Sequence, residues 1–396
     1  MNILALSARL PYPLDTGAKI RSFHVLKTLS EGHELTLLSF IGGTDEYVHI
    51  ESLKKLGITV EPVLNPLVDK GISPFTILKC ALSSNPITVE KYASRAFKSA
   101  YECLLHQHFD LIHCEHLHMA HYISPRLPQL KTFDAHNVES EIVQRLQTQE
   151  AKLFKKLVLT WHRKKMQRYE QENLRKFDLV LAVSDRDKEN LAALSGIQNT
   201  RILENGVDID YFSPAHHASS NNIVFVGSMD WWPNDDGIQS FIVKTFPLIL
   251  AQNPGVRFFI VGRKPSKELL NIAEQHENIE VTGAVDDVRP FIENAAVYVV
   301  PLRVGGGTRL KVLEAFAMGK AIVSTSMGSE GITYTHGQDI LIEDEPVLFA
   351  NAVLRLLDDS KLRRFLGTNA IALATNYSWK TIGIKLQKLY DELTES

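Results

Sequence analysis

Residues 297–320 read VYVVPLRVGGGTRLKVLEAFAMGK, and this stretch decides the fold. The apolar run from Val297 to Pro301 predicts a short buried strand, and a loop with three glycines follows it. Apolar residues at helical spacing begin after Thr308, so we expect a helix to start there. A strand, a glycine loop and a helix in succession indicate an α/β domain with a parallel sheet.

The glycine loop predicts a site for an anion. Glycines let backbone N–H groups approach a ligand, and the start of a helix carries unpaired N–H groups and about half a positive charge. Arg309 and Lys311 lie in the first helical turn, where a cation opposes the helix dipole unless an anion is bound between them. We therefore expect a phosphate group there. The loop residues expected to contact the substrate are Gly305, Gly306, Gly307, Thr308 and Leu310.

Glu314 follows in the same predicted helix and is expected to bind hydroxyl groups. A carboxylate accepts two hydrogen bonds, as a ribose diol requires. The alternative is a merely flexible glycine loop with Arg309 as a solvated surface residue. The cations, the helix start and the carboxylate occur together, and this combination favours a binding site. The chain has neither a Gly-x-Gly-x-x-Gly motif after a strand nor a P-loop.

Length and composition restrict the class of protein. A chain of 396 residues suits two domains. The formal net charge of −3 argues against a nucleic-acid partner. Cys80, Cys103 and Cys114 have no metal-ligand spacing and predict reduced thiols in a cytoplasmic protein without structural zinc. No apolar run approaches the ~20 residues that span a bilayer, so any membrane contact is expected to be peripheral.

Alternating strand and helix patterns predict the domain organisation. From Ile3 to Val63 strands and helices alternate, which implies a parallel sheet covered on both faces. The polar stretch HHASSNN at 216–222 is typical of a linker, and the same alternation resumes after it. We expect two Rossmann-like doubly wound parallel-sheet domains, at 1–214 and 222–376, that face a central cleft.

A polar cluster follows a predicted strand of the first domain. In LKTFDAHNVESE the strand ends near Phe133, and His136, Asn137 and Glu139 come directly after it. Ligands of open α/β sheets bind at the carboxyl ends of the strands. An isolated histidine is more often structural, but this setting favours a functional His136.

The segment 145–176 is strongly basic and predicted to be helical. It holds ten Lys or Arg residues against three Glu, and its apolar residues follow helical spacing. Such a helix can lie on an anionic membrane. A solvated charged face over a domain core is the simpler alternative.

Six motifs occur in succession along nearly the whole chain. They are TGAKIRSFHVLKTLSEGHEL at 16–35, DAHNVE at 134–139, DLVLAVS at 178–184, NGVDIDYFSP at 205–214, FVGSMDWWPNDDG at 225–237 and GGGTRLKVLEAFAMGKAIVST at 305–325. Together they resemble the family 4 glycosyltransferases of the GT-B fold. The resemblance implies transfer of a sugar from a nucleoside diphosphate donor with retention of configuration, without a metal ion or other cofactor. It also implies that the C-terminal helix, at 377–396, crosses back onto the first domain.

The resemblance implies roles for single residues. Glu314 matches the second glutamate of a pair with seven residues between them and would bind the donor ribose, although Gly306 stands in place of the first glutamate. His136 matches a histidine beneath the donor sugar. Gly17 matches a glycine in a loop near the phosphate and the acceptor.

Two further positions depart from the family pattern. Many relatives place Arg and Lys where this chain has Ser228 and Asn234, so Arg309 and Lys311 are expected to bind the diphosphate instead. The expected catalytic residues are His136, Arg309 and Lys311. Substrate contacts near the strand ends of the second domain are expected from Gly227, Ser228 and Arg263.

The expected partners are a nucleotide-sugar donor and a carbohydrate or lipid-linked acceptor. A role in cell-envelope or exopolysaccharide synthesis, at the inner face of the membrane, follows from the resemblance alone. Asp185-x-Asp187 and Asp208-x-Asp210 imitate a metal motif but are expected to be cap and turn residues. The alternatives are a nucleotide-sugar epimerase of the same fold and a nucleotide-sugar-binding protein without transferase activity.

Overall fold

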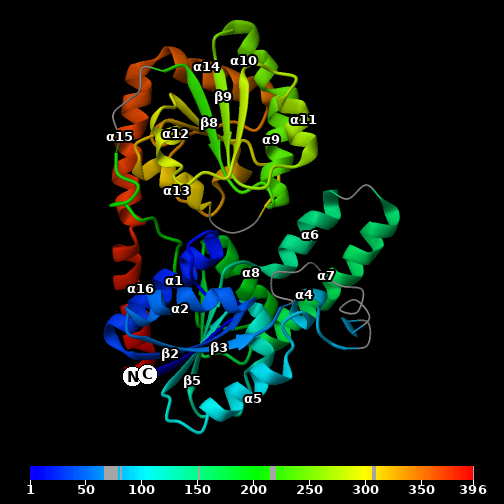
Figure 1. Cartoon of the computed structure of the whole chain (residues 1–396), viewed down its shortest axis with the longest axis vertical. Helices are drawn as coiled ribbons and strands as arrows, with labels where there is room; N and C mark the ends of the chain where they lie inside the picture. Colours follow the sequence, from blue (N-terminus) through cyan, green and yellow to red (C-terminus); the bar gives the residue numbers. More distant parts are fainter. Residues whose placement is uncertain (67–78, 81–82, 150–151, 215–219, 306–308, 396) are drawn as a thin grey trace. The chain divides into compact units, whose positions relative to one another are not determined.

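The computed structural model describes residues 1–66, 79–80, 83–149, 152–214, 220–305 and 309–395. The chain forms two compact units (Figure 1). Unit 1 contains residues 1–204 and 383–396, and unit 2 contains residues 205–382.

Unit 1 is built on a seven-stranded parallel sheet with the order β3-β2-β1-β4-β5-β6-β7. Its strands are β1 (Asn2–Ser7), β2 (Glu34–Ile41), β3 (Ile58–Leu64), β4 (Leu111–Glu115), β5 (Leu130–Ala135), β6 (Leu179–Ala182) and β7 (Thr200–Ile202). Its helices are α1 (Gly17–Gly32), α2 (Tyr47–Lys54), α4 (Ile87–Glu90), α5 (Arg95–Leu104), α6 (Glu139–Gln149), α7 (Leu153–Leu174) and α8 (Asp185–Ser195), with 3-10 turns η1 (Thr44–Glu46) and η2 (Leu117–Tyr122).

Unit 2 is built on a six-stranded parallel sheet with the order β10-β9-β8-β11-β12-β13. Its strands are β8 (Asn222–Val226), β9 (Arg257–Val261), β10 (Ile279–Gly283), β11 (Val297–Val300), β12 (Ile322–Ser324) and β13 (Leu341–Ile342). Its helices are α9 (Trp232–Lys244), α10 (Phe246–Gln252), α11 (Lys267–Ala273), α12 (Arg289–Glu293), α13 (Leu310–Ala317), α14 (Pro346–Asp358) and α15 (Ser360–Asn376), with a 3-10 turn η3 (Met327–Ser329).

These two parallel sheets with helices around them confirm the predicted fold class. The strands read as continuous apolar runs because both faces of each sheet are covered; all four residues of β11 are buried. Beyond β12, the short strand β13 forms the edge of the second sheet. Ser184 caps α8 by accepting from the N–H of Asp187, and the Asp208 carboxylate accepts from the N–H groups of Asp210 and Tyr211, as expected of cap and turn residues.

The division between the units differs from the boundary at 214 to 222 expected from the linker composition. Residues 205–214 belong with unit 2. Val207 is buried in its core, its N–H donates to the carbonyl of Tyr377 at 2.8 Å, and its carbonyl accepts from Trp379 at 3.2 Å. Two strand-like hydrogen bonds therefore hold this segment where composition alone suggested the end of the first domain.

Helix α16 (Trp379–Glu395) begins in unit 2, and its residues from Gly383 onward belong with unit 1. The Tyr390 hydroxyl is fully buried and lies 2.9 Å from Oγ1 of Thr132 and 2.7 Å from Nδ1 of His113. At the helix surface, Lys385 donates to Glu204 at 2.7 Å. These contacts attach the end of the chain to the first sheet.

Unit 1 contains a buried ion pair next to the carboxyl ends of its strands. Arg21 of α1 is 1% exposed and Asp134 of β5 is fully buried. The guanidinium donates from Nε to one carboxylate oxygen at 2.8 Å and from its terminal nitrogen to the other at 2.5 Å. Such a two-pronged pair is the form in which buried charges are best satisfied.

Replacing Arg21→Met should destabilise the protein by about 3–5 kcal/mol, because it leaves the Asp134 carboxylate buried without its partner. Arg168→Met is the matched control, since Arg168 pairs with Glu172 at 2.8 Å on the exposed surface and its loss should change stability little. Chemical denaturation of both variants measures the difference. Equal effects of the two substitutions would contradict a structural role for the buried pair.

Candidate functional site

The strand order of unit 2 changes direction between β8 and β11. In open parallel sheets ligands bind at such a switch point, beyond the carboxyl ends of the strands. The loop after β8 begins at Gly227, and the loop after β11 leads through Gly305 to α13. Gly227 and Gly305 therefore follow the strands at which a ligand is expected.

The side chain of Lys311 in α13 reaches the backbone of Gly227. Its ammonium donates to the side-chain oxygen of Asn234 at 2.7 Å and lies 4.2 Å from the centre of the Phe225 ring. Burial and the like charge of Arg309 lower the pKa of Lys311 to about 7, although Glu314 partly offsets the shift. A bound anion would restore the charged form.

Glycines bring the backbone close to this ammonium. A β-carbon at Gly227 would lie 2.5 Å from Nζ of Lys311, and one at Gly262 would lie 1.8 Å from the carbonyl oxygen of Gly227. At Gly262 the clash is with backbone, so only glycine fits there; at Gly227 a β-carbon would displace the ends of the Lys311 and Asn234 side chains. The backbone of Gly227 therefore lies close to the Lys311 ammonium.

Arg263 reaches the same loop from the end of β9. Its Nε donates to the hydroxyl of Ser228 at 2.8 Å, and that hydroxyl donates to Asp230 at 2.5 Å. Ser228 and Asn234 stand where family members place Arg and Lys, and here both accept hydrogen bonds from cations of other elements, Arg263 and Lys311. Basic side chains of other elements therefore reach these two positions, where the local sequence has none.

Arg309 lies directly before α13, and its side chain is buried rather than solvated. Its Nε donates to the carbonyl of Met327 at 3.2 Å, and its terminal nitrogen lies 3.6 Å from a carboxylate oxygen of Glu330. A β-carbon at Gly305 would lie 2.6 Å from the guanidinium. The arginine therefore lies against Gly305 and contacts the segment after β12.

Glu314 lies half-buried one turn beyond Lys311 in α13, and Leu310 is the first residue of the helix. Burial raises the pKa of Glu314 to about 7, and Lys311 partly offsets the shift. A carboxyl group poised in this way can accept hydroxyl hydrogen bonds once it ionises. The predicted contacts Gly306, Gly307 and Thr308 lie outside the described residues.

Unit 1 has its own polar cluster at its switch point, between β1 and β4. Glu115 ends β4 and is fully buried. Its two oxygens lie 3.3 Å from Nε2 of His113 and 3.1 Å from Nε2 of His136, and the hydroxyl of Ser22 donates to it. Burial alone would raise the pKa of Glu115, but these hydrogen bonds outweigh it and hold the pKa well below its ordinary value.

The cluster connects the C-terminal helix to His136. Tyr390 contacts Nδ1 of His113, His113 contacts Glu115 through Nε2, and Glu115 contacts His136. His136 also lies 3.5 Å from the Asp134 carboxylate, whose other contacts are with Arg21. This series of buried hydrogen bonds fixes the orientation of the His136 ring.

Glu115, His116 and His136 bring possible metal-ligand atoms within 4.8 Å of one another. The imidazole rings of His116 and His136 are stacked, with centres 3.9 Å apart and planes 26° apart. A metal ion lies near the plane of each imidazole that binds it, and two stacked rings do not share such a point. Since the Glu115 oxygens already accept hydrogen bonds, this group resembles a hydrogen-bonded cluster more than a metal site.

The other predicted site residues of unit 1 differ in burial and in their contacts. Asn137 is half-buried directly after His136. Glu139 begins α6, and its N–H donates to Glu170 of α7 at 2.7 Å. Burial and the neighbouring Glu170 raise the pKa of Glu139 to about 8, so its carboxyl is protonated at neutral pH. Gly17 is exposed as the first residue of α1, which Thr16 caps.

The sequence analysis missed most of the side chains that hold these predicted residues. His113 and Glu115 alternate with apolar residues along β4, and this period of two was an available signal. No local pattern marks Tyr390 or Arg21 as their partners. The missed site residues are Arg21, Ser22, His113, Glu115, Asp134, Phe225, Met327, Glu330 and Tyr390.

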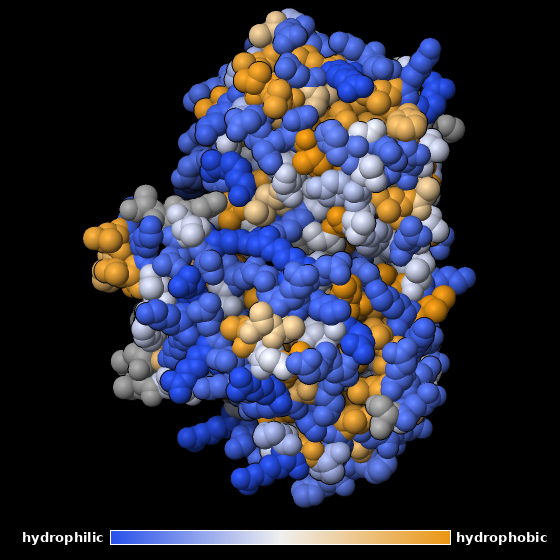
Figure 2. Space-filling model, turned by 180° about the vertical axis from the view of Figure 1, so that it is seen from behind, coloured by the Kyte–Doolittle hydropathy of each residue, from blue (hydrophilic) through white to orange (hydrophobic). Residues whose placement is uncertain are grey.

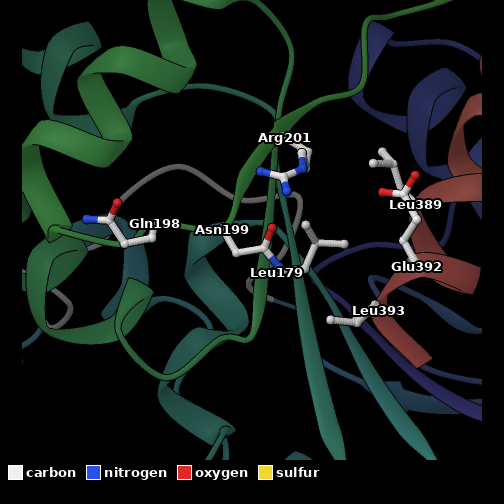
Figure 3. A pocket seen from close by; sticks show the side chains of 7 residues that line it. All are labelled: Leu179, Gln198, Asn199, Arg201, Leu389, Glu392 and Leu393. Carbon is white, nitrogen blue, oxygen red and sulfur yellow. The ribbon is translucent and has the colours of Figure 1, made fainter. Parts of the chain in front are cut away.

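A cavity of about 310 Å³ in unit 1 contains none of the predicted site residues (Figure 3). It lies near the starts of β6 and β7, at the opposite edge of the sheet from Glu115. Arg201 lines it from β7 and Glu392 from α16. Its position argues against a role in the candidate site.

Family models match both halves of the chain. Residues 29–211 match the model described as Glycosyltransferase Family 4, and residues 220–359 match the model described as Glycosyl transferases group 1. A phosphatidyl-myo-inositol mannosyltransferase of Mycolicibacterium smegmatis is 23% identical over 289 residues, which cover 69% of this chain and 71% of that protein. An uncharacterized 44.6 kDa protein of Klebsiella pneumoniae is matched over only 44% of its own length.

Two solved structures share the fold over almost the entire chain. Sucrose-phosphate synthase from Thermosynechococcus elongatus is 17% identical, with a TM-score of 0.76 and complete coverage of both chains. HepE from Anabaena, in complex with UDP and glucose, is 16% identical, with a TM-score of 0.71 and coverage of 99% of this chain and all of that one. At these identities the likeness establishes the fold alone.

Above pH 7, binding of a nucleoside diphosphate hexose should be accompanied by proton uptake. Lys311, with a pKa of about 7, is then mostly neutral in the free protein, and the bound diphosphate should raise its pKa. Affinity should therefore fall as the pH rises further. Titration calorimetry in buffers of different ionisation enthalpy measures the protons exchanged.

Lys311→Met is the matched control for this uptake. Glu314, whose pKa is about 7, gives the opposite sign, because hydroxyl hydrogen bonds favour its ionised form. The variant should therefore show no uptake and at most proton release. Unchanged uptake in Lys311→Met would show that the titrating group is elsewhere.

Proposed function

Since the chain belongs to the GT-B glycosyltransferases, we propose that it transfers a hexose-type sugar from a nucleoside diphosphate to a glycan or lipid-linked acceptor, with retention of configuration. The observation that carries the proposal is the arrangement of α13 in unit 2. Lys311 lies against Gly227 at the switch point, and Glu314 lies one turn further along the helix. Together they suit a diphosphate and a ribose.

The leaving nucleoside diphosphate needs compensation of its developing negative charge. In this proposal Lys311, Arg309 and the N–H groups at the start of α13 supply it, in place of a metal ion. The sugar passes through an oxocarbenium-like state, and the acceptor hydroxyl enters from the face that the diphosphate leaves. The departing phosphate accepts the hydroxyl proton. No protein nucleophile is required.

His136 is proposed to act on the donor sugar, with Glu115 as a positioning residue. Glu115 holds Nε2 of the imidazole at 3.1 Å, so Nδ1 is left for a hydroxyl of the sugar. The mannosyltransferase relative and the HepE complex with UDP and glucose support a nucleotide-sugar donor and a carbohydrate acceptor. The lipid named in that relative supports a lipid-linked acceptor, a role in cell-envelope or exopolysaccharide synthesis and contact with the inner membrane surface.

A panel of UDP- and GDP-hexoses, incubated with glycan and lipid extracts, tests the proposed reaction. Mass spectrometry should detect a product heavier by one hexose, with the α or β configuration of the donor retained in its NMR spectrum. Chelation of divalent ions should not slow the reaction. Donor binding without any transfer would favour a binding protein, and interconversion of the donor sugars would favour an epimerase.

Glu115→Gln and His136→Ala should each lower kcat by at least about tenfold, with little change in KM for the donor. If Glu115 acts only through His136, the double variant should lose no more activity than His136→Ala alone. Steady-state kinetics of the three variants, with thermal unfolding as a check on folding, measures this. Losses that multiply in the double variant would contradict the positioning role.

A further inference from the structure

Helix α7 carries an apolar stripe that the core of unit 1 does not cover. Its members are Leu153, Phe154, Leu157, Val158 and Trp161, with exposed fractions between 42% and 79%. Their spacing places them within about 140° of the helix circumference. Figure 1 shows the start of α7 at the right, and Figure 2, which is turned by 180°, shows an apolar group that projects from the molecule at the left. A continuous exposed patch of this kind marks an interaction surface.

The stripe is separate from the face by which α7 packs. His162, Met166, Tyr169 and Asn173 are buried, and Met166 and Tyr169 belong to the core of unit 1. At about 100° per residue this packing face lies roughly 130° away from the centre of the stripe. Folding of unit 1 therefore does not explain the five apolar residues, because other side chains of the helix already supply its core contacts.

Lysines border the stripe. Residues 152–165 include six Lys or Arg residues and no Asp or Glu. Lys152, Lys155, Lys156 and Lys164 are exposed. Lys155 and Lys156 project about 60° outside either edge of the stripe. Long basic side chains in this position can keep their ammonium groups at a headgroup layer while the apolar residues enter below it.

A tryptophan completes the pattern. Trp161 is 44% exposed at one end of the stripe, and the ammonium of Lys165 lies 4.9 Å from the centre of its ring. Tryptophan is enriched at the boundary between a bilayer and water. In the part of the chain that the structure describes, no helix is long and apolar enough to cross a membrane. Contact through α7 would therefore be with the bilayer surface.

We propose that residues 153–161 of α7 insert into the surface of an anionic lipid bilayer, with Lys155 and Lys156 at its headgroups. Charge complementarity and the combination of apolar, aromatic and basic side chains select this partner. Within the basic segment 145–176, the proposed membrane contact is thus restricted to the exposed residues at the start of α7. This contact deepens the proposed function, because a lipid-linked acceptor would lie in the same bilayer surface. It rests on the proposed function in that respect only.

Flotation with vesicles tests the proposal on the full-length protein, without donor or acceptor. The protein should bind vesicles that contain phosphatidylglycerol, bind pure phosphatidylcholine vesicles weakly, and dissociate as salt is added. Phe154→Ser with Leu157→Ser should reduce binding at least about tenfold, and Lys155→Glu with Lys156→Glu should do the same. The fluorescence of Trp161 should shift to shorter wavelength on binding, and Trp161→Phe should abolish that shift.

Phe365→Ser is the matched control, since Phe365 of α15 is exposed to 51% and lies outside the stripe. It should bind vesicles as the wild type does. Absence of vesicle binding by the wild type, or equal binding by all variants, would overturn the proposal. A change of self-association in the stripe variants, measured by light scattering, would instead assign the surface to a second copy and also overturn it.

Turnover of a water-soluble donor and acceptor without vesicles tests the proposed function separately. Stripe variants with normal turnover and lost vesicle binding would support the bilayer proposal. Intact vesicle binding by a protein that transfers no sugar would remove the proposed function and leave the bilayer contact standing.

Discussion

The candidate site of unit 2 depends on one contact, that of the Lys311 ammonium with Gly227, the glycine that follows β8. The space that a β-carbon would occupy at Gly227 holds the ammonium instead. The Phe225 ring below it and the Asn234 oxygen beside it only partly replace water, so the charged form is disfavoured. An anion bound beside this ammonium would favour its charged form again.

The surrounding residues follow from that constraint. Gly262 lets β9 approach the carbonyl of Gly227, and Arg263 can then reach Ser228 from the next strand. Arg309 does not compete with Lys311 for the same position, because its guanidinium is turned under Gly305 toward Met327 and Glu330. Two cations that looked equivalent in the sequence thus differ in their contacts: Lys311 contacts Asn234 beside Gly227, and Arg309 contacts Met327 and Glu330.

In unit 1, buried charged and polar groups hold the imidazole of His136 in place. Asp134 and Glu115 are both buried carboxylates near His136, and each has a partner of its own, Arg21 or His113. Tyr390 closes the series from a helix at the far end of the chain. Buried polar groups are costly unless every member is satisfied, so this cluster ties the orientation of His136 to correct docking of α16.

The sequence was most informative where the chemistry is local. The glycine loop, Lys311 and Glu314 lie within ten residues, and the alternation of strands and helices was sufficient to predict two parallel sheets. Contacts between distant segments were not predictable. Tyr390 and His113 are 277 positions apart, and Val207 joins unit 2 through a backbone pairing with residues near 378 that composition does not reveal. Lys311 was expected from the sequence to replace a missing local cation, but its contact with Asn234 and that of Arg263 with Ser228 were not predictable.

A crystal structure of the protein with a nucleoside diphosphate tests the central claim most directly. The phosphate oxygens should lie within hydrogen-bond distance of Nζ of Lys311 and of the N–H groups at the start of α13, and the ribose hydroxyls should reach the carboxylate of Glu314. A nucleotide bound elsewhere on either unit, with Lys311 still paired only to Asn234, would contradict the claim.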